Sequence, residues 1–401
     1  MKVTHLSPSG GIGGAESVIL ACIRAGDGWP DAESSVVTLE AGPFLAAAER
    51  AGATVRTVQA PSTLTALGDS FASTAAVAWD MVPVATRFPR FFRRFSRTVA
   101  ELLPEVIHSH GIKTHVLAAL LVRRAPVIWH LHDYVGLRPM SSRLLRLLGR
   151  RCSLAIAVSD SVAQDARGYL PATLPIVVVH NAIDCGRFNP EGPALDLDAL
   201  SSLPPAPEGT IRVGLPATFA RWKGHETFLQ AIALLNRPDV RAYVIGGEIY
   251  RTGKSQWSEP ELRAIAAAHG LAASVGFTGL VHDMPSAYRA LDIVVHASTR
   301  PEPFGLVIPE AMACGCAVIA SPDGGAGELF VAGRHALAAK SGDAEALAAA
   351  IRSLLDDREG RVALGERARA HVVASFGSDR FATDLRAALA HLHVDPAEAT
   401  A

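Results

Sequence analysis

The sequence predicts an α/β protein built from two doubly wound parallel-sheet domains that face each other across a cleft. Short apolar runs alternate with longer amphipathic runs, which is the pattern of βαβ units. The alternation stops at a proline-rich stretch near the middle of the chain and then begins again. The 401 residues also exceed one ordinary core and suit two domains of roughly 150–200 residues each.

The first domain is expected over residues 1–190. Its short apolar runs are predicted to be strands, at residues 2–6, 34–39, 54–58, 105–110, 126–132, 154–159 and 175–180. Between them, amphipathic runs at 15–26 and 113–124 are predicted to be helices. Strands of this kind, joined through helices, form parallel sheets.

A linker is predicted at residues 191–209, because prolines in and beside this stretch cannot sustain a helix or an inner strand. The second domain is expected over residues 210–374. Its predicted strands are 211–219, 242–247, 275–279, 292–298 and 317–321, and its predicted helices are 225–235, 260–270, 284–291 and 343–357. Ligands of such sheets bind beyond the carboxyl ends of the strands, so the loops there carry the functional interest.

Composition and charge exclude several classes of protein. The formal net charge is −1 and charged residues make up 19%, so no overall field recruits nucleic acid. The start of the chain lacks the pattern of a signal peptide, and no apolar run approaches the roughly 18–20 residues that cross a bilayer. The five scattered cysteines are typical of a reducing compartment. We therefore expect a cytoplasmic protein.

A glycine-rich turn, GGIGGAE, follows the first predicted strand. Gly13 and Gly14 would let the backbone approach a phosphate or a sugar where the next helix starts. The turn resembles a dinucleotide-binding fingerprint, but Glu16 stands where that fingerprint has its third glycine. A tight turn without a ligand and a ligand-binding loop both stay open from these residues.

A basic turn, RWKG, follows the first strand of the second domain and opens a helix. Arg221 and Lys223 supply two cations, and Gly224 permits close approach where the helix dipole is positive. Two cations beside unpaired amides suit a diphosphate. The alternative is a solvated basic turn without a ligand.

Two carboxylates, Glu302 and Glu310, flank the short apolar run of EPFGLVIPE. Glu302 follows a predicted strand, and Pro309 suits a first helical position, which would place Glu310 in the first helical turn. Two acceptors at a fixed separation fit the two polyol ends of a nucleotide sugar. A glycosidase acid/base pair would leave the basic helix start unexplained, and a helix-capping glutamate would leave Glu302 unexplained.

With these motifs in place, the chain resembles the retaining glycosyltransferases of family 4 (glycosyltransferase group 1), which share an E-x7-E motif. The resemblance extends over nearly the whole chain, through segments in the family's order: GGIGGAE, HSHG, WHLHD, AVSDSV, VVHNAID, RWKGHETFLQAI, VGFTGLVHDMPSAYRALDIVVHAS, EPFGLVIPE and GDAEALAAAI. It implies the GT-B fold, with two Rossmann-like domains, of which the first binds the acceptor and the second the nucleotide-sugar donor. It also implies that residues 375–401 form a helix that packs back on the first domain.

The resemblance further implies which residues act on the donor. Lys223, with Arg221, would hold the donor diphosphate, Glu302 would face the donor sugar, and His132 would lie near the reacting sugar. The other donor-binding positions that it implies are Gly13 and Gly14 over the phosphates, Gly279 and Leu280 beside the base, the amides of Phe304, Gly305 and Leu306, and Glu310 at the ribose.

The chain departs from the family pattern at one basic position. The family usually has Gly-Arg five residues before the lysine, whereas this chain has Ala217 and Thr218 there. We expect Arg221 to replace that arginine from closer range.

The sequence predicts no metal site and no cofactor. The Asp-x-Asp of residues 196–198 lies in the predicted linker, and the family acts without a metal there. The histidine pairs at 108/110 and 130/132 lack a four-ligand zinc pattern.

Residues 87–97 interleave arginines with phenylalanines in RFPRFFRRFSR. On a helix they would present a surface suited to anionic lipid headgroups, that is, a peripheral contact at the inner face of the membrane. An amphipathic helix that packs its phenylalanines on the sheet is the equal alternative.

We therefore predict a retaining, metal-independent glycosyltransferase of bacterial glycan, glycolipid or natural-product biosynthesis. It would move a sugar from a nucleotide-diphosphate sugar to a hydroxyl of a small-molecule, glycan or lipid-linked acceptor. The rivals are a nucleotide-sugar epimerase of the same fold, a non-catalytic sugar-nucleotide-binding subunit and, more remotely, a dehydrogenase.

Overall fold

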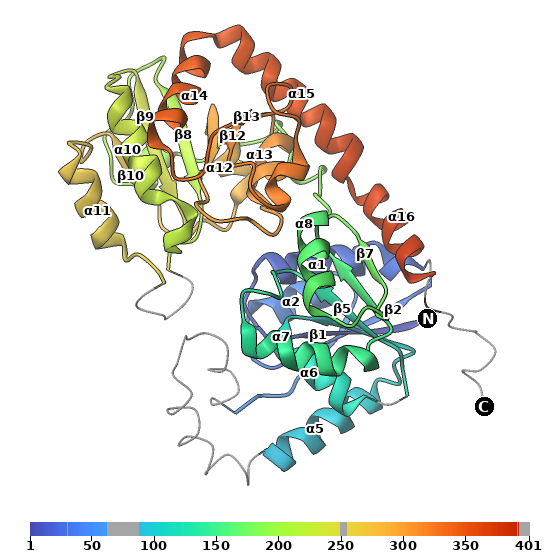
Figure 1. Ribbon diagram of the computed structural model, residues 1–401. Coiled ribbons are helices and arrows are strands. Elements are labelled where there is room, and N and C mark those ends of the chain that lie inside the picture. The colour runs from blue at the N-terminus through green and yellow to red at the C-terminus, as the bar shows by residue number, and fades with distance from the viewer. Residues whose placement is uncertain (30, 62–87, 123, 249–254, 391, 393–401) are drawn as a thin grey trace. The chain divides into compact units, whose positions relative to one another are not determined.

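The computed structural model describes residues 1–29, 31–61, 88–122, 124–248, 255–390 and 392. The chain divides into two compact units, shown in Figure 1. The first combines Met1–Ala182 with Ser378–Ala401, and the second is Ile183–Gly377. Each unit contains one parallel sheet with helices packed on it.

The sheet of the first unit has seven strands in the order β3-β2-β1-β4-β5-β6-β7. The strands are β1 Lys2–Ser7, β2 Glu33–Thr38, β3 Thr54–Thr57, β4 Val106–His110, β5 Val127–Leu131, β6 Leu154–Ala157 and β7 Ile176–Val178. Every neighbouring pair is parallel. The central strands β4 and β5 are buried along their whole length, as expected of a sheet that is covered on both faces.

The helices of the first unit come from both ends of the chain. They are α1 Gly14–Arg24, α2 Pro43–Arg50, α5 Phe88–Glu101, α6 Ile112–Leu121, α7 Pro139–Leu148, α8 Asp160–Tyr169 and α16 Ser378–Leu389. Figure 1 shows α16, in red, beside the blue amino-terminal part of the sheet. Its buried side chains Phe381 and Leu385 share one hydrophobic core with Val3 and Val106 of the sheet. The carboxyl-terminal helix is thus part of the first unit.

The sheet of the second unit has six strands in the order β10-β9-β8-β11-β12-β13, again all parallel. The strands are β8 Ile211–Pro216, β9 Val240–Ile245, β10 Val275–Phe277, β11 Ile293–His296, β12 Ala317–Ala320 and β13 Leu337–Ala338. The helices are α9 Leu197–Leu200, α10 His225–Leu235, α11 Glu259–Ala268, α12 Met284–Arg289, α13 Val307–Ala313, α14 Ala344–Asp356 and α15 Arg358–Phe376. The doubly wound α/β class predicted from the alternating pattern is confirmed in both units.

The segment predicted as a linker, residues 191–209, belongs to the second unit instead. The side chain of Asp196 caps the short helix α9, whose Leu197 is buried. The carboxylate of Asp198 accepts hydrogen bonds from Arg241 (2.8 Å) and Tyr243 (2.7 Å) of β9. Prolines do break regular structure here, but these contacts fix the segment to the second sheet. The structure changes units at Ala182–Ile183 and at Gly377–Ser378, not at 190 and 374.

Helix α5 shows how the arginine–phenylalanine segment packs. Phe91 and Phe95 are buried in the first unit, whereas Arg90, Arg93 and Arg94 are exposed. The aromatic side chains are therefore largely core, and the basic side chains form the solvent face of the helix. Residue 87, at the start of the predicted segment, lies outside the described residues.

None of the described helices is long and apolar enough to span a membrane.

Candidate active site

The two glutamates of EPFGLVIPE lie at the carboxyl end of strand β11. Glu302 is almost fully buried, with 6% of the residue exposed. Its main chain is fixed by a hydrogen bond from the Glu302 amide to the Asp323 carbonyl (3.1 Å) and one from the Gly325 amide to the Glu302 carbonyl (2.8 Å). The loop that carries Glu302 is therefore tied to the segment that follows β12.

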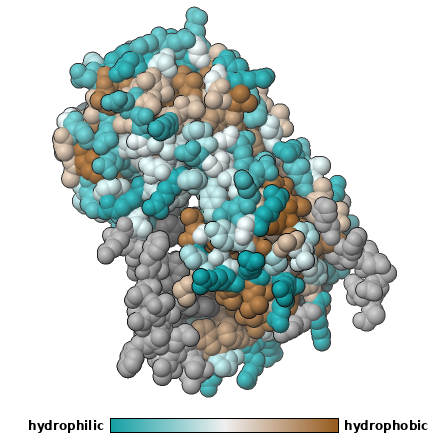
Figure 2. Space-filling model, viewed as in Figure 1, coloured by the Kyte–Doolittle hydropathy of each residue, from teal (hydrophilic) through white to brown (hydrophobic). Residues whose placement is uncertain are grey.

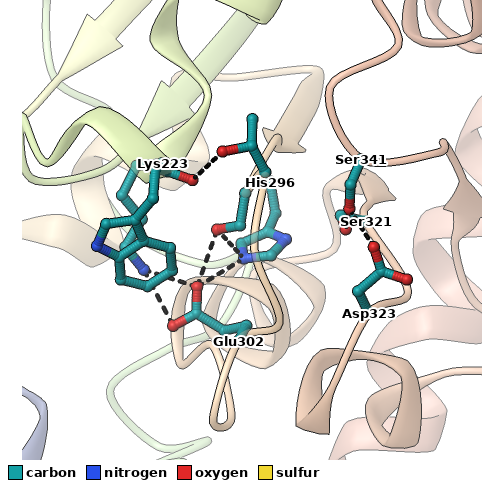
Figure 3. Close-up of polar contacts among 9 residues, drawn as sticks. Lys223, His296, Glu302, Ser321, Asp323 and Ser341 are labelled. Carbon is teal, nitrogen blue, oxygen red and sulfur yellow. Dashed lines mark hydrogen bonds and ion pairs between the residues drawn. The ribbon is translucent and has the colours of Figure 1, made fainter. Parts of the chain in front are cut away.

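The Glu302 carboxylate collects three donors from two neighbouring segments, as Figure 3 shows for Lys223 and His296. Lys223 Nζ lies 2.7 Å from Oε2 and 3.0 Å from Oε1. Ser298 Oγ donates to Oε2 at 2.9 Å, and His296 Nε2 lies 3.1 Å from the same oxygen. Burial alone would raise the pKa of Glu302, but Lys223 and His296 outweigh it and lower that pKa below its usual range. Glu302 is thus held as a carboxylate.

The position of Lys223 depends on the glycine that follows it. Residues Arg221–Lys223 form a 3₁₀ turn, and Gly224 has φ +77° at the start of α10. A Cβ on Gly224 would stand 1.8 Å from the carbonyl oxygen of Ala297, the residue after β11. Thr299 also donates its amide to the Trp222 carbonyl at 2.7 Å. The basic turn and the Glu302 loop therefore touch through their backbones, which brings the two side chains together.

Residues 304–306 lead from Glu302 into helix α13. Phe304 is buried and packs edge-on against Phe376, with 6.2 Å between the ring centroids. Gly305 has φ +88°, and a Cβ there would stand 3.1 Å from Glu302 Cγ. The helix begins at Val307, directly after Leu306, so Pro309 occupies its third position and not the first as predicted. The Glu310 amide already donates to the Leu306 carbonyl at 3.0 Å.

Glu310 lies in the first turn of α13 and contacts α12. The hydroxyl of Tyr288 donates to Glu310 Oε2 at 2.9 Å. Burial raises the pKa of Glu310 to about 7, although Tyr288 and Arg187 act in the opposite direction. The two carboxylates of the motif therefore differ in character: Glu302 is paired and ionised, whereas Glu310 changes charge near neutral pH.

Gly279 and Leu280 lie at the same sheet edge, after β10. The Gly246 amide, which follows β9, donates to the Gly279 carbonyl at 3.0 Å. Leu280 is 56% exposed, and Gly247 lies against it, since a Cβ on that glycine would stand 3.0 Å from Leu280 Cγ. Gly246 in turn passes close to the Ala217 carbonyl. The carboxyl ends of β8, β9 and β10 thus meet here.

Arg221 is not brought to Glu302. Its guanidinium lies 3.6 Å from the centroid of the Trp257 ring and 3.1 Å from Glu261 Oε1, at the start of α11. In this structure Lys223 supplies the cation at Glu302, and the side chain of Arg221 contacts another element.

In the first unit, Gly13 and Gly14 begin helix α1, as the glycine turn predicted. Gly13 is the residue before the first helical turn, and its amide donates to Glu16 Oε2 at 3.1 Å. Glu16 Oε1 also accepts from Ser7 Oγ at 2.9 Å. Glu16, which interrupts the dinucleotide fingerprint, therefore closes the glycine turn from inside.

His132 follows strand β5 and is half-buried. It is one end of a cluster of five histidines on neighbouring strands. The two H-x-H pairs supply four of them, and His5 of β1 is the fifth. His110 Nδ1 lies 2.9 Å from His132 Nε2, and His110 Nε2 lies 3.1 Å from His5 Nδ1. His108 Nε2 and His130 Nδ1 form a separate pair at 3.1 Å.

Several of these ring nitrogens lie close enough together to be compared with a metal site, because the groups His5/His108/His110 and His110/His130/His132 each fit within 4.8 Å. Only two rings of each group are hydrogen-bonded to each other, His5 with His110 in the first group and His110 with His132 in the second. The third rings, His108 and His130, are hydrogen-bonded to one another.

Two family models match the chain, one on each half. "Glycosyltransferase Family 4" matches residues 12–187, and "Glycosyl transferases group 1" matches residues 204–371. The lipopolysaccharide core biosynthesis mannosyltransferase LpcC of Rhizobium leguminosarum bv. viciae is 34% identical over 239 residues, which are 59% of this chain and 64% of LpcC. The match thus spans just under two thirds of that relative.

A second relative and a solved structure are also similar to this chain. A D-inositol 3-phosphate glycosyltransferase of Corynebacterium jeikeium is 32% identical over 54% of this chain and 52% of its own length. HepE of Anabaena, solved in complex with UDP-glucose, is 26% identical and covers 98% of this chain and 100% of its own, with a TM-score of 0.80. The expected fold class is confirmed.

Proposed function

The chain belongs to the group 1 glycosyl transferases of glycosyltransferase family 4, and we propose that it is a retaining glycosyltransferase that uses a nucleotide-diphosphate sugar. One observation carries the proposal. At the carboxyl edge of the second sheet, Lys223 and Glu302 converge from two different strand ends, and Glu302 is held as a carboxylate. A cation for a leaving diphosphate and an acceptor for sugar hydroxyls are thus in place next to each other.

In this proposal the donor occupies the carboxyl edge of the second sheet. Its diphosphate binds the ammonium group of Lys223, which then no longer pairs with Glu302. The sugar hydroxyls donate hydrogen bonds to the Glu302 carboxylate in its place. The ribose binds Glu310, and the base lies beside Gly279 and Leu280. The amides of Phe304, Gly305 and Leu306 complete the donor site.

The remaining candidate residues have supporting roles in the proposal. Gly13 and Gly14 of the first unit would cover the phosphates, and His132 would meet the reacting sugar. Arg221 would join the diphosphate after it leaves Glu261. None of these proposed roles requires a metal or a cofactor.

The chemistry needs little from the protein beyond position and charge. The acceptor hydroxyl attacks the anomeric carbon on the face from which the diphosphate leaves, so the configuration is retained. The bond from the anomeric carbon to the leaving phosphate oxygen breaks, and that phosphate takes the proton of the acceptor. Lys223 stabilises the negative charge that develops, an effect worth about 3–4 kcal/mol for one such contact.

The names of the relatives guide the choice of donor and acceptor. LpcC acts in lipopolysaccharide core biosynthesis and is a mannosyltransferase, and HepE was solved with UDP-glucose. We propose a hexose donor and a glycan or lipid-linked acceptor for this chain.

A lipid-linked acceptor would bring the enzyme to the inner face of the membrane as a peripheral protein of the cytoplasm. Helix α5 exposes Arg90, Arg93, Arg94 and Arg97. Near and on α7, four large hydrophobic side chains are exposed, Leu137, Met140, Leu144 and Leu147. Figure 2 shows that hydrophobic residues also reach the surface of the first unit on the face in view. Basic and apolar surface together favour anionic lipid headgroups.

A thermal-shift screen followed by a transfer assay tests the proposal. We expect one of UDP-, GDP-, ADP- or dTDP-hexose to raise the melting temperature of the wild-type protein and not of Glu310→Gln. With that donor and a lipid-extract or core-oligosaccharide acceptor, the protein should release free nucleoside diphosphate and form an axial or equatorial linkage that matches the donor, with EDTA present. Conversion of the donor into its epimer without transfer would instead identify an epimerase, and binding without turnover a non-catalytic subunit.

A further inference from the structure

A hydrogen-bonded chain of buried groups runs from the core of the first unit to His132. Asp27 Oδ1 lies 2.8 Å from His5 Nε2, and His5 Nδ1 lies 3.1 Å from His110 Nε2. His110 Nδ1 then lies 2.9 Å from His132 Nε2. We call Asp27, His5, His110 and His132 the histidine chain.

The strands explain why these groups meet. β1 and β4 are parallel neighbours, with His5 opposite His108, and β4 pairs with β5 so that His110 lies opposite His130. His108 and His110 are two residues apart and share one face of the sheet, as side chains alternate along a strand. The cluster is therefore built into the register of three central strands.

Asp27 is held in an unusual backbone conformation at the inner end of the chain. Its φ is +48°, between two glycines that also have positive φ. Its side chain is 1% exposed, and Ser34 donates to Oδ2 at 2.5 Å. A non-glycine residue in this region costs about 1–2 kcal/mol, which the surrounding structure must offset. Both oxygens of the buried Asp27 carboxylate are thus hydrogen-bonded, Oδ1 to His5 and Oδ2 to Ser34.

For an ionised Asp27 and neutral rings, the hydrogen bonds of the histidine chain can run in one direction only. An ionised carboxylate only accepts hydrogen bonds, and a neutral imidazole has one N–H and one acceptor nitrogen. With Asp27 ionised and every ring neutral, His5 donates from Nε2 to Asp27 and accepts at Nδ1, so His110 donates from Nε2. His110 then accepts at Nδ1, so His132 donates from Nε2.

Burial keeps the outer rings neutral. It lowers the pKa of His110 well below the ordinary value, and it lowers the pKa of His132 to about 3. His110 is fully buried, and His132 is the half-buried end.

We propose that Asp27 is a positioning residue: through His5 and His110 it holds His132 in the tautomer that carries its proton on Nε2, so that Nδ1 is presented as an acceptor for a sugar hydroxyl. The part that concerns the sugar rests on the proposed function. The part that concerns the tautomer does not.

Asp27→Asn is the direct test. With its N–H toward His5 Nε2 and its carbonyl oxygen toward the Ser34 hydroxyl, the asparagine reverses every donor and acceptor along the histidine chain and places the proton of His132 on Nδ1. In nitrogen NMR spectra of the full-length protein labelled at histidine, the protonated-type signal of His132 should move from Nε2 to Nδ1. The His132 signals are assigned by their loss in His132→Gln. Ser34→Ala is the matched control, because it removes the other hydrogen bond of Asp27 but keeps the carboxylate, and it should leave the tautomer unchanged.

Activity provides the second readout. Asp27→Asn should lower kcat about 10-fold with the donor KM within about 2-fold of wild type, and Asp27→Glu should recover part of the loss. If Asp27→Asn does not fold, His110→Gln is measured instead, which interrupts the chain one step nearer to His132.

The outcomes separate the two proposals. An unchanged His132 tautomer in a folded Asp27→Asn protein overturns the inference, even if activity falls, because the effect would then be structural. A wild-type tautomer with the proton on Nδ1, or one equivalent of tightly bound zinc whose removal changes the histidine spectrum, also overturns it. A tautomer that follows Asp27 in a protein that transfers no sugar supports the histidine chain and refutes the proposed function alone.

Discussion

Lys223 Nζ lies 2.7 Å and 3.0 Å from the two carboxylate oxygens of Glu302, and this pair is largely removed from solvent. The two residues are 79 positions apart in sequence. In the absence of a donor, Lys223, the proposed partner of the diphosphate, and Glu302, the proposed acceptor for the sugar hydroxyls, therefore neutralise each other's charge. Donor binding has to replace this contact, and the charge of each partner is present before the donor arrives.

We expect Lys223→Ala to lower kcat by about 10²–10³-fold, because the charge on the leaving diphosphate loses its partner. It should also destabilise the second unit by about 3–5 kcal/mol, because the buried Glu302 is left without its counter-charge. Denaturant unfolding and steady-state kinetics measure the two effects. The double variant Lys223→Met with Glu302→Gln should recover much of the stability and none of the activity. Wild-type turnover in Lys223→Ala would refute the assignment.

The stability of the second unit should depend on Glu302 in acid. Because its folded-state pKa is lowered, Glu302 contributes stability above its unfolded pKa of about 4.3, and this is lost as the pH falls below that value. The difference in melting temperature between wild type and Glu302→Gln should therefore begin to shrink as the pH falls from 5 to 3, and it should continue to shrink toward the lowered folded-state pKa. A constant difference across this range would contradict the pairing.

The contribution of Glu310 to folding stability should depend on pH in the opposite direction. Its folded-state pKa is raised to about 7, so its contribution to stability is present below about pH 4.3 and is lost as the pH rises through 7. Glu310→Gln should then be more stable than wild type at pH 8 and similar to it at pH 4.

Nucleotide binding offers an independent check on Glu310. The carboxylate accepts hydrogen bonds from a ribose diol better than the protonated acid, so the affinity for the nucleoside diphosphate should rise several-fold between pH 6 and pH 8. Calorimetry on Glu310→Gln should give a weaker affinity without this pH dependence. Equal affinities in the two proteins would remove Glu310 from the ribose site.

Gly224→Ala should cost at least about 2 kcal/mol of stability and most of the activity, because both its φ of +77° and the Ala297 carbonyl oppose a Cβ. Gly279→Ala is the matched control. Its φ is +68°, but no atom lies within 4 Å of the added Cβ, so only about 1 kcal/mol of backbone strain is expected. Equal unfolding free energies for the two variants would contradict the close contact at Gly224.

Phe381→Ala should destabilise the first unit by about 3–5 kcal/mol, because this fully buried ring packs in the core of a sheet formed by the other end of the chain. Thr383→Ala, on the exposed side of α16, should change stability by less than about 0.5 kcal/mol. Tryptophan fluorescence and hydrogen exchange of β1 and β4 would report the difference. Protection of these strands that is unaffected by Phe381→Ala would place α16 outside the core.

The fold was predictable because most strands are short apolar runs that alternate with amphipathic helices. The two-residue strand β13 and the helices α8 and α15 were not predicted from this pattern. The helix at 225–235 lies where the pattern placed it, and the strand predicted at 211–219 begins at residue 211 but ends at residue 216. The linker was not predictable from its prolines, because Asp198 forms its anchoring contacts with Arg241 and Tyr243, about forty residues away. Proline content reports local backbone restriction, whereas domain membership depends on distant partners.

The candidate site was predictable in composition and only partly in geometry. Spacing and residue type singled out Lys223, Glu302 and Glu310. The contact of Arg221 with Trp257 and Glu261 could not be foreseen, because it depends on how α11 is placed. The histidine chain was also missed, since His5 and Asp27 have no motif spacing to the H-x-H pairs and meet them only through strand register.

Helix α16 has a consequence for how the protein is made. On the ribosome, residues 1–182 emerge first but lack the helix that fills their core, and the whole second unit must follow before that helix appears. Translation proceeds at about 5–20 residues per second, so this delay lasts on the order of ten seconds or more. During it, the part of the core that Phe381 and Leu385 will cover stays exposed. The half of the protein that is translated first is thus completed last. Chaperone dependence and sensitivity to premature termination should be concentrated in this interval.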